Sequence, residues 1–314
     1  MYTIVSATHA VANFVRLLVL FALLCPRSAL AEITVTDDLR ATVTLAGPAM
    51  RVVSLAPHIT ELLFAAGAGE QIIGVVRHSD FPPAALEIAQ IGSYKSISYE
   101  ALLALQPDLV VAWHSGNGSE IIARLRELGL TVYVNEPRTL PHVARALRDF
   151  GQLTGHAEAA SSAADSFEAR FTALQARYRD RPLVSVFYQV WNQPLTTLNG
   201  EHLISDVIRL CGGNNVFADA VVLAPQINVE SVIRVDPQVI VASGMGESRP
   251  EWLDMWEAWP SIRAVRTHQL YYVPPDLLQR HTPRVLDGAE ILCRHLDETR
   301  ASMSKPAAGV SNLR

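Results

Sequence analysis

Short runs of β-branched residues alternate with short amphipathic stretches along most of the chain. In its first half the predicted strands and helices follow one another at residues 51–56, 58–67, 71–76, 98–106, 108–113, 119–129 and 131–134. Such alternation is typical of a mostly parallel sheet that helices cover on both faces. Before it, residues 32–45 alternate around a polar Asp-Asp turn, which predicts a β-hairpin at the start of the folded chain.

A long helical pattern separates this half from the next. Residues 140–179 contain no strand signal, and their second part is Ala-rich with apolar residues at helical spacing, which predicts one helix of about 35 Å. After it the α/β alternation returns at residues 183–190, 202–213, 229–236, 238–243, 251–259, 269–273 and from about 282 onward. We therefore predict two Rossmann-like α/β lobes with central, mostly parallel sheets, joined by one long rigid helix.

The N-terminal segment has the features of a secretory signal peptide. Arg16 precedes an apolar run at residues 17–25, which is too short to span a bilayer as a helix, and small residues follow up to Ala31. A lipid anchor at Cys25 and an uncleaved membrane anchor are the alternatives. The predicted boundaries are a signal peptide at 1–31, an N-terminal lobe at 32–154, a connecting helix at 155–180, a C-terminal lobe at 181–303 and a disordered tail at 304–314.

The composition of the 314 residues, 49% hydrophobic and 18% charged, predicts a folded protein with two cores of ordinary domain size rather than one large core. A net charge of −5 and the absence of any block of Lys and Arg exclude a general nucleic-acid binder. The chain contains no G-x-S-x-G, H-E-x-x-H or P-loop motif, and no G-x-G-x-x-G after a predicted strand. These absences favour a binding protein over an enzyme.

Removal of the signal peptide leaves two cysteines, Cys211 and Cys293. In an exported protein an even count favours a disulfide. Each of the two lies late in a helical pattern, from which both can face a common core. We predict a disulfide between them, with two separate buried thiols as the alternative.

A repeated unit places one glutamate in each predicted lobe. The stretches "ISYEALLALQPDLVVA" and "INVESVIRVDPQVIVA" align without a gap, and Glu100 and Glu230 occupy the same point in them. Ser98 and Asn228 are predicted N-caps, so both carboxylates fall in a first helical turn, where each contributes about 0.3–1 kcal/mol. That electrostatic effect explains either glutamate alone. As a pair on equivalent helices, they predict two contacts for a cationic partner.

Aromatic and polar residues gather in the loops that follow the predicted strands. Ligands of open α/β sheets bind beyond the carboxyl ends of the strands, so these loops predict a pocket for a large ligand. Four of the loops carry a histidine, at His58, His78, His114 and His281. No pair has the close spacing of a metal motif, and we predict no metal site. A cluster formed only in three dimensions, which would suit a secreted metal-dependent hydrolase, is the alternative.

At these motifs the mature chain resembles a known family, the periplasmic substrate-binding proteins of cobalamin, haem and siderophore ABC importers. Members of that family have two lobes joined by one long helix. The similar stretches are "RVVSLAPHITELLFAAG", "GVVRHSDFPP", "LLALQPDLVVAW", "LISDVIRLCGGNNVF" and the terminal "RHTPR…ILC". The "SDFPP" turn, the "AWHSGN" loop and both cysteine positions resemble the cobalamin-binding type in particular.

The resemblance implies roles for individual residues. It places permease-docking glutamates at Glu100 and Glu230, and a disulfide between Cys211 and Cys293. It places contacts to the corrin ring at His78, Tyr94, Trp113, Val190, Ala224 and Arg280. Four of these positions depart from the family pattern, with His78 for Tyr, Tyr94 for Trp, Val190 for Phe and Ala224 for Trp. The departures keep the size class of the ligand and weaken its exact identity.

The corrin ring is a broad, mostly apolar disc edged by amides. We expect Tyr94, Trp113 and Trp191 to cover its surface and Asn117 and Arg280 to hydrogen-bond its rim. His78 is expected at the rim as well, with coordination of the cobalt as the alternative. Because the two lobes are joined by a helix, we expect little hinge motion and a largely preformed cleft.

These observations together predict a periplasmic, monomeric binding protein. We expect it to capture cobalamin or a related corrinoid between its lobes and to deliver this ligand to an inner-membrane ABC transporter permease. No cofactor, no nucleic-acid partner and no chemistry on the ligand are expected. A haem or ferric-siderophore ligand is the alternative within the same class.

Overall fold

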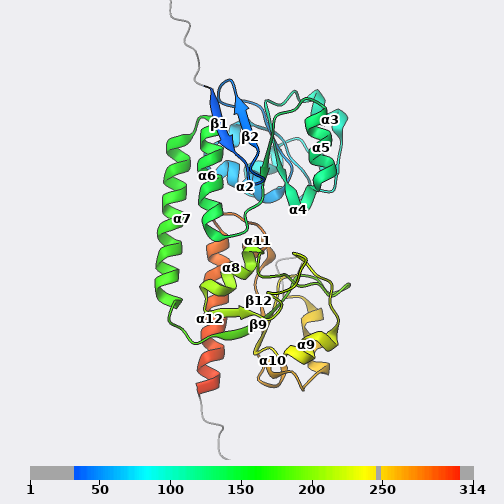
Figure 1. Ribbon diagram of the computed structural model, residues 1–314, viewed down its shortest axis with the longest axis vertical. Helices are drawn as coiled ribbons and strands as arrows, with labels where there is room; N and C mark the ends of the chain where they lie inside the picture. The colour runs from blue at the N-terminus through cyan, green and yellow to red at the C-terminus, as the bar shows by residue number, and fades with distance from the viewer. Residues whose placement is uncertain (1–31, 245–248, 305–314) are drawn as a thin grey trace, which may run out of the picture.

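Each half of the chain is built around a four-stranded parallel sheet, as the computed structural model of residues 32–244 and 249–304 shows (Figure 1). The N-terminal sheet contains β3 (Val52–Ser54), β4 (Ile72–Gly74), β7 (Leu109–Trp113) and β8 (Val132–Asn135). The C-terminal sheet contains β9 (Val184–Gln189), β10 (Gly213–Asn215), β11 (Val239–Ala242) and β12 (Leu270–Tyr272). The strand orders are β4-β3-β7-β8 and β10-β9-β11-β12, so both sheets have the same connectivity. The predicted α/β class with two parallel sheets is confirmed.

Helices and two hairpins complete the lobes. The N-terminal lobe adds α2 (Pro57–Ala65), α3 (Tyr99–Ala104), α4 (His114–Asn117), α5 (Ser119–Glu127), α6 (Leu140–Thr154), η1 (Gly69–Gln71) and η2 (Pro83–Glu87). Its hairpins are β1 (Ile33–Thr36) with β2 (Thr42–Leu45), as predicted, and β5 (Gly92–Ser93) with β6 (Ser96–Ile97). The C-terminal lobe adds α8 (Leu203–Leu210), α9 (Val229–Val235), η3 (Glu251–Ala258), α10 (Arg263–Arg266), α11 (Pro275–Leu278) and α12 (Val285–Ser304).

The structure adds detail that the prediction for the C-terminal lobe lacked, including the short helices α10 and α11. The helical pattern at residues 251–259 forms the 3₁₀ helix η3 and not an α-helix. Strand β10 was not predicted, because its residues Gly213, Asn214 and Asn215 have low strand propensity. Its parallel pairing with β9 holds it in the sheet, so tertiary context decides its conformation.

A layer of long helices runs along one side of both lobes (Figure 1). Helix α7 (Ala157–Tyr178) packs against α6 of the N-terminal lobe and against α8 and α12 of the C-terminal lobe. Gly155 ends α6 at a φ of +79°, in the left-handed region that glycine enters at little cost, and this turn reverses the chain into α7. The long connecting helix is therefore present, packed along its length against both lobes.

The apolar core differs from the expected two separate cores. One continuous core extends through both lobes along the helical layer, from Val35 of the first hairpin to Leu296 of α12. The other face of each sheet packs against a smaller core of its own. Successive side chains of a strand point to opposite faces of the sheet and therefore enter different cores. Val52 belongs to the shared core and Val53 to the smaller core of the N-terminal lobe. Composition alone could not reveal this division, which depends on how the helical layer bridges the lobes.

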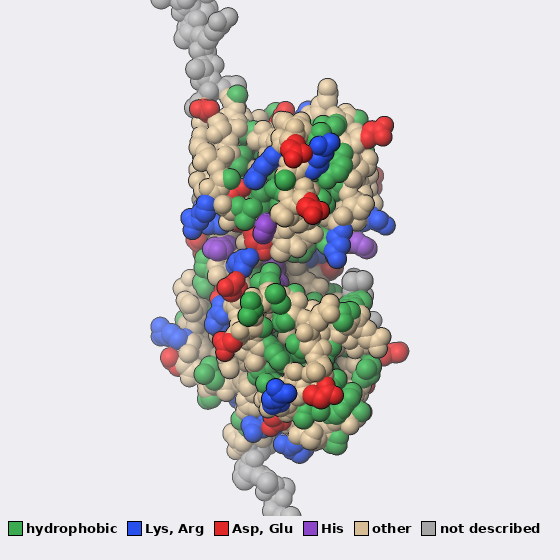
Figure 2. All heavy atoms as spheres, turned by 45° about the vertical axis from the view of Figure 1, so that its right-hand side comes forward, with side chains coloured by type: hydrophobic (Ala, Val, Ile, Leu, Met, Phe, Trp, Pro, Cys, Tyr) green, Lys and Arg blue, Asp and Glu red, His purple; other side chains and the backbone are tan. Residues whose placement is uncertain are grey.

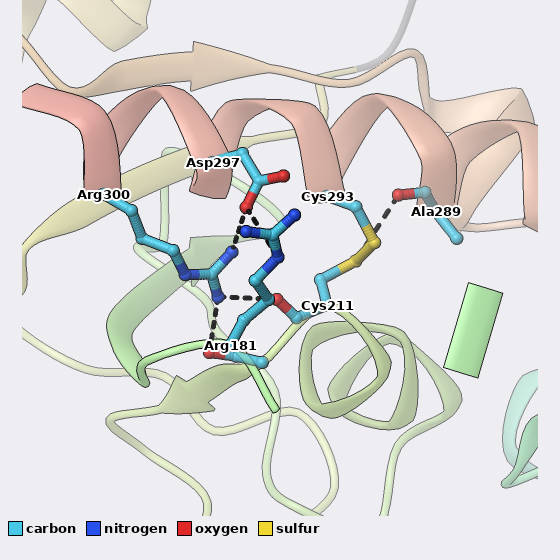
Figure 3. The surroundings of a disulfide bond; sticks show 7 residues. Arg181, Cys211, Ala289, Cys293, Asp297 and Arg300 are labelled. Atoms are coloured by element: carbon cyan, nitrogen blue, oxygen red, sulfur yellow. Dashed lines mark hydrogen bonds and ion pairs between the residues drawn. A yellow bond between two sulfur atoms is a disulfide. The ribbon is translucent and has the colours of Figure 1, made fainter. Parts of the chain in front are cut away.

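The predicted disulfide between Cys211 and Cys293 is confirmed (Figure 3). It joins the end of α8 to the middle of α12, with both cysteines fully buried. Arg300 of α12 supports the same junction, because its guanidinium donates to the carbonyl oxygens of Cys211 and Gly212 at 2.7 and 2.9 Å. A cation at these carbonyls also compensates the negative end of α8. The disulfide and these two hydrogen bonds thus tie α8 to the helical layer.

Residues 32–244 and 249–304 include no helix with the length and apolarity needed to cross a membrane. The predicted signal peptide at 1–31 lies outside the described residues. The same holds for all but the first residue of the predicted tail at 304–314.

Candidate ligand-binding cleft

A cleft with a cavity of about 620 Å³ lies between the two lobes, at the carboxyl ends of the strands. Figure 2 shows a narrow waist between the lobes, with hydrophobic side chains gathered on the C-terminal lobe just below it. The five predicted ligand residues that line this cavity are Tyr94, Trp113, Val190, Trp191 and Ala224. A cavity of about 700 Å³ near Met50 and Gln71 involves the N-terminal lobe alone, and no predicted ligand residue lines it.

The N-terminal wall of the cleft is aromatic. Tyr94 occupies the two-residue turn of the β5–β6 hairpin and Trp113 ends β7, and their ring centroids lie 5.8 Å apart. Asn117 holds both in place. Its Oδ1 accepts from the backbone N–H of Trp113 at 2.6 Å, and its Nδ2 donates to the carbonyl oxygens of Tyr94 at 2.7 Å and Leu55 at 3.0 Å.

The predicted hydrogen bond of Asn117 to the rim of a ligand stays a prediction. The side chain is buried, does not line the cavity, and has both ends of its amide engaged by the backbone. Asn117 therefore positions the aromatic wall. The sequence pattern marked the residue but could not show which way its amide points.

The C-terminal wall consists mainly of small and aliphatic side chains. Val190 and Trp191 follow β9, and Thr196, Leu198, Leu223 and Ala224 complete this side. Trp191 is 37% exposed, and its indole N–H donates to the carbonyl oxygen of Gln193 at 2.9 Å. The two walls thus differ, with two tilted aromatic rings in contact on one side and mainly aliphatic side chains on the other.

Three histidines gather at the floor of the cleft. His281 lies with its ring centroid 5.7 Å from that of His58 in the N-terminal lobe and 5.1 Å from that of His202 in the C-terminal lobe. Two of the four histidines considered as metal ligands, His58 and His281, therefore lie close together. His202, which was not predicted, lies beside them. Within the part of the chain that the structure describes, no group of three or more His, Cys, Asp or Glu side chains is arranged to hold a metal ion.

Burial lowers the pKa of all three imidazoles. It lowers the pKa of His281 to about 4, and the pKa values of His58 and His202 fall well below the usual range through burial and then through the neighbouring His281. Neither ring nitrogen of His281 has a hydrogen-bond partner among the described residues. The cluster is therefore neutral at pH 7 and is unfavourable to protonate.

The histidine cluster predicts loss of stability in acid. The unfolded chain binds a proton on the residue-281 imidazole near pH 6.5 and the folded chain only near pH 4, so stability falls as the pH drops through this window. At pH 5 we expect His281 alone to remove about 2 kcal/mol from the free energy of unfolding. Urea unfolding at pH 7.5 and 5.0 measures the difference. The difference in free energy of unfolding between the two pH values should be about 2 kcal/mol smaller in His281→Asn than in the wild type. It should stay unchanged in the control His268→Asn, whose side chain is exposed. An equal difference in all three proteins would contradict the assignment.

Arg280 and His78 lie beside the cleft and do not line its cavity. The Arg280 guanidinium pairs with Asp80 of the N-terminal lobe at 2.6 Å and with Asp276 at 3.1 Å, and it donates to the carbonyl oxygen of His78 at 3.3 Å. Its side chain is only 12% exposed. Arg280 therefore bridges the two lobes, and its contact with the rim of a ligand stays a prediction.

A second ion pair also joins the lobes. Arg284 binds the carboxylate of Glu61 through two hydrogen bonds of 2.7 and 2.6 Å, and its guanidinium lies 3.7 Å from the ring centroid of Phe81. Glu61 is 3% exposed. The hydrogen bonds to Glu61 raise the pKa of Arg284, as expected of a planar two-point contact. A third pair, between Arg138 and Glu201, crosses the lobes in an exposed position.

The repeated glutamates occupy equivalent positions. Ser98 accepts from the N–H of Ala101 at 3.2 Å and Asn228 from that of Ser231 at 3.0 Å, which confirms both predicted N-caps. Glu100 therefore lies in the first turn of α3 and Glu230 in that of α9, and both are exposed. The two helices lie away from α7, on the right-hand side of Figure 1.

The family model described as periplasmic binding protein matches residues 52–277. The chain therefore belongs to the periplasmic binding protein family, whose members bind solutes and are not enzymes. Membership of this family excludes the alternative of a secreted metal-dependent hydrolase. It also agrees with the lobes, the helical layer and the cleft described here.

Among its relatives, the vitamin B12-binding protein of Vibrio cholerae serotype O1 is 38% identical over 250 residues, which cover 79% of this chain and 90% of that protein. The crystal structure of the periplasmic vitamin B12 binding protein BtuF of Vibrio cholerae has a TM-score of 0.75 at 36% identity, and covers 82% of this chain and 99% of its own. The periplasmic heme-binding protein RhuT from Roseiflexus sp. RS-1 has a TM-score of 0.69 at 24% identity, over 79% of this chain and 98% of its own. At that identity the likeness concerns the fold alone.

Proposed function

We propose that this protein binds cobalamin or a closely related corrinoid in the cleft between its lobes. The observation that carries the proposal is the aromatic wall of Tyr94 and Trp113 facing an aliphatic wall across a cavity of about 620 Å³. A flat, mostly apolar macrocycle fits such a space, and large ligand sites combine apolar walls with few polar groups. The relatives named as vitamin B12-binding proteins support the same ligand.

The delivery step is part of the proposal. The protein acts in the periplasm after removal of residues 1–31, as a monomer, and hands its ligand to an inner-membrane ABC transporter permease. Glu100 and Glu230 are the contacts for this partner, because each lobe presents one exposed carboxylate at the start of an equivalent helix. Two separated anionic points match two cationic points and set the orientation of docking.

Titration of the purified protein with cobalamin, haemin and a ferric siderophore tests the ligand. We expect cobalamin binding, and an affinity about 30-fold lower in Trp113→Ala, since a buried tryptophan at the centre of an interface contributes about 2 kcal/mol. Trp252→Ala is the matched control, because Trp252 lines a separate hollow of the C-terminal lobe. Binding of haemin without cobalamin would contradict the ligand, and equal affinities of the two variants would contradict the site.

A further inference from the structure

Arginine far outnumbers lysine among the cationic residues of this chain. Of its 26 Lys and Arg residues only two are lysines, Lys95 and Lys305. Lys305 lies outside the described residues. Lys95 lines the cleft. A compact ammonium group therefore stands at the ligand site of a protein that uses arginine almost everywhere else.

The β5–β6 hairpin presents Lys95 to the cleft. Lys95 and Tyr94 form its two-residue turn, and Asn117 fixes the turn by donating to the carbonyl oxygen of Tyr94. The Lys95 ammonium lies 5.6 Å from the centroid of the Tyr94 ring, so it sits above the aromatic wall. Its side chain is exposed, and no carboxylate of the described residues pairs with it.

The two arginines described beside the cleft are already paired. Arg280 binds Asp80 and Asp276, Arg284 binds Glu61, and the floor histidines are neutral at pH 7. The residues that line the cleft in the described part of the chain include no Asp or Glu. Lys95 is thus a positive charge without compensation, at the mouth of a site that is otherwise uncharged.

We propose that Lys95 is a specificity-determining residue, whose ammonium binds an anionic group at the edge of the ligand. This inference rests on the proposed function. In a complete corrinoid the anionic group is the phosphodiester of the nucleotide loop, which cobinamide lacks and cobinamide phosphate retains in part. An ammonium group recognises phosphate as a point charge, without needing the two-point geometry of arginine.

Binding of cobalamin, cobinamide phosphate and cobinamide to wild type, Lys95→Met and Lys95→Arg tests this role. In Lys95→Met we expect affinity for the first two ligands to fall about five-fold at low salt and affinity for cobinamide to stay unchanged. Lys95→Arg should retain most of the preference. The difference in affinity between the wild type and Lys95→Met should become smaller at high salt, because the contact is exposed. An equal loss for all three ligands, or no loss for any, would overturn the inference.

The same experiment separates the two proposals. A wild-type protein that binds no corrinoid would overturn the proposed function and this inference with it. A wild-type protein that binds cobalamin, with full affinity in Lys95→Met, would overturn the inference alone. If the wild type bound only haemin, and if Lys95→Met bound haemin more weakly, Lys95 would recognise the carboxylates of haemin. The proposed contact with phosphate would then be wrong.

The scarcity of lysine supplies a direct readout. Reductive methylation with ¹³C-formaldehyde keeps the charge and labels Lys95, Lys305 and the N-terminal amine, and the Lys95→Arg variant identifies the signal of Lys95. We expect this signal to shift when cobalamin or cobinamide phosphate is added and to stay in place with cobinamide. A shift of equal size with cobinamide would contradict contact with the phosphate.

Discussion

Replacement of both Glu100 and Glu230 by arginine is expected to stop transporter-dependent uptake of the ligand while its affinity for the binding protein stays unchanged. Both carboxylates are exposed and lie in the first turns of α3 and α9, outside the residues that line the cleft. Like charges brought together at an interface cost several kcal/mol, so we expect uptake to fall by about 100-fold or more. Uptake of labelled ligand into reconstituted transporter vesicles, beside ligand titration, measures the two properties separately.

Glu158→Arg is the matched control for this variant. Glu158 is also an exposed carboxylate in a first helical turn, that of α7, on the side of the molecule away from α3 and α9 (Figure 1). Each reversal replaces a favourable helix-start interaction of about 0.3–1 kcal/mol with an unfavourable one of similar size, which is small enough that all variants should stay folded. Uptake that survives in the double variant, or fails equally in Glu158→Arg, would contradict docking through the two glutamates.

Arg284→Met is expected to lower the free energy of unfolding by about 3–5 kcal/mol, because it leaves the Glu61 carboxylate buried without its partner. Glu61 is 3% exposed and receives both hydrogen bonds of this contact across the lobes. Methionine keeps much of the length and apolar bulk of arginine, so the loss reports on the charge. Urea unfolding at pH 7.5, with the m-value checked for two-state behaviour, measures it.

Arg138→Met serves as the control across the same lobes. Its partner Glu201 is 71% exposed at the side chain, and exposed pairs contribute at most about 1 kcal/mol. The double variant Glu61→Gln with Arg284→Met removes both charges and should recover part of the loss. If Arg284→Met and Arg138→Met were equally stable, the buried pair would not be the main polar contact between the lobes.

Local patterns in the sequence predicted most of the fold. Runs of β-branched residues and helical spacing located seven of the eight strands in the two four-stranded sheets. The repeated unit located both N-caps, because these features depend on residues close together in the chain. The missing strand β10 follows from pairing with β9 and has no strand signal of its own. The shared core was not predictable, since it arises where the helical layer meets both sheets.

The cleft was predicted at the level of walls and not of polar contacts. Trp113 and Trp191 line it because they lie where predicted strands end, and Tyr94 lines it from the turn of the β5–β6 hairpin, which was not predicted. Asn117 and Arg280 contact neighbours far away in sequence, such as Leu55 and Asp80, which local patterns could not reveal, and their contacts with a ligand stay predictions. His202 was missed because its helical stretch gave no hint that it would meet His281.

The continuous core has a consequence for how a transporter can recognise a loaded protein. The lobes share buried side chains from Val35 to Leu296, so moving one lobe against the other would expose apolar surface and oppose close packing. We therefore expect the angle between the lobes to change little when the cleft is filled. Under the proposed function, we expect the transporter to recognise occupancy at the mouth of the cleft, where a bound molecule changes the shape and charge of the surface.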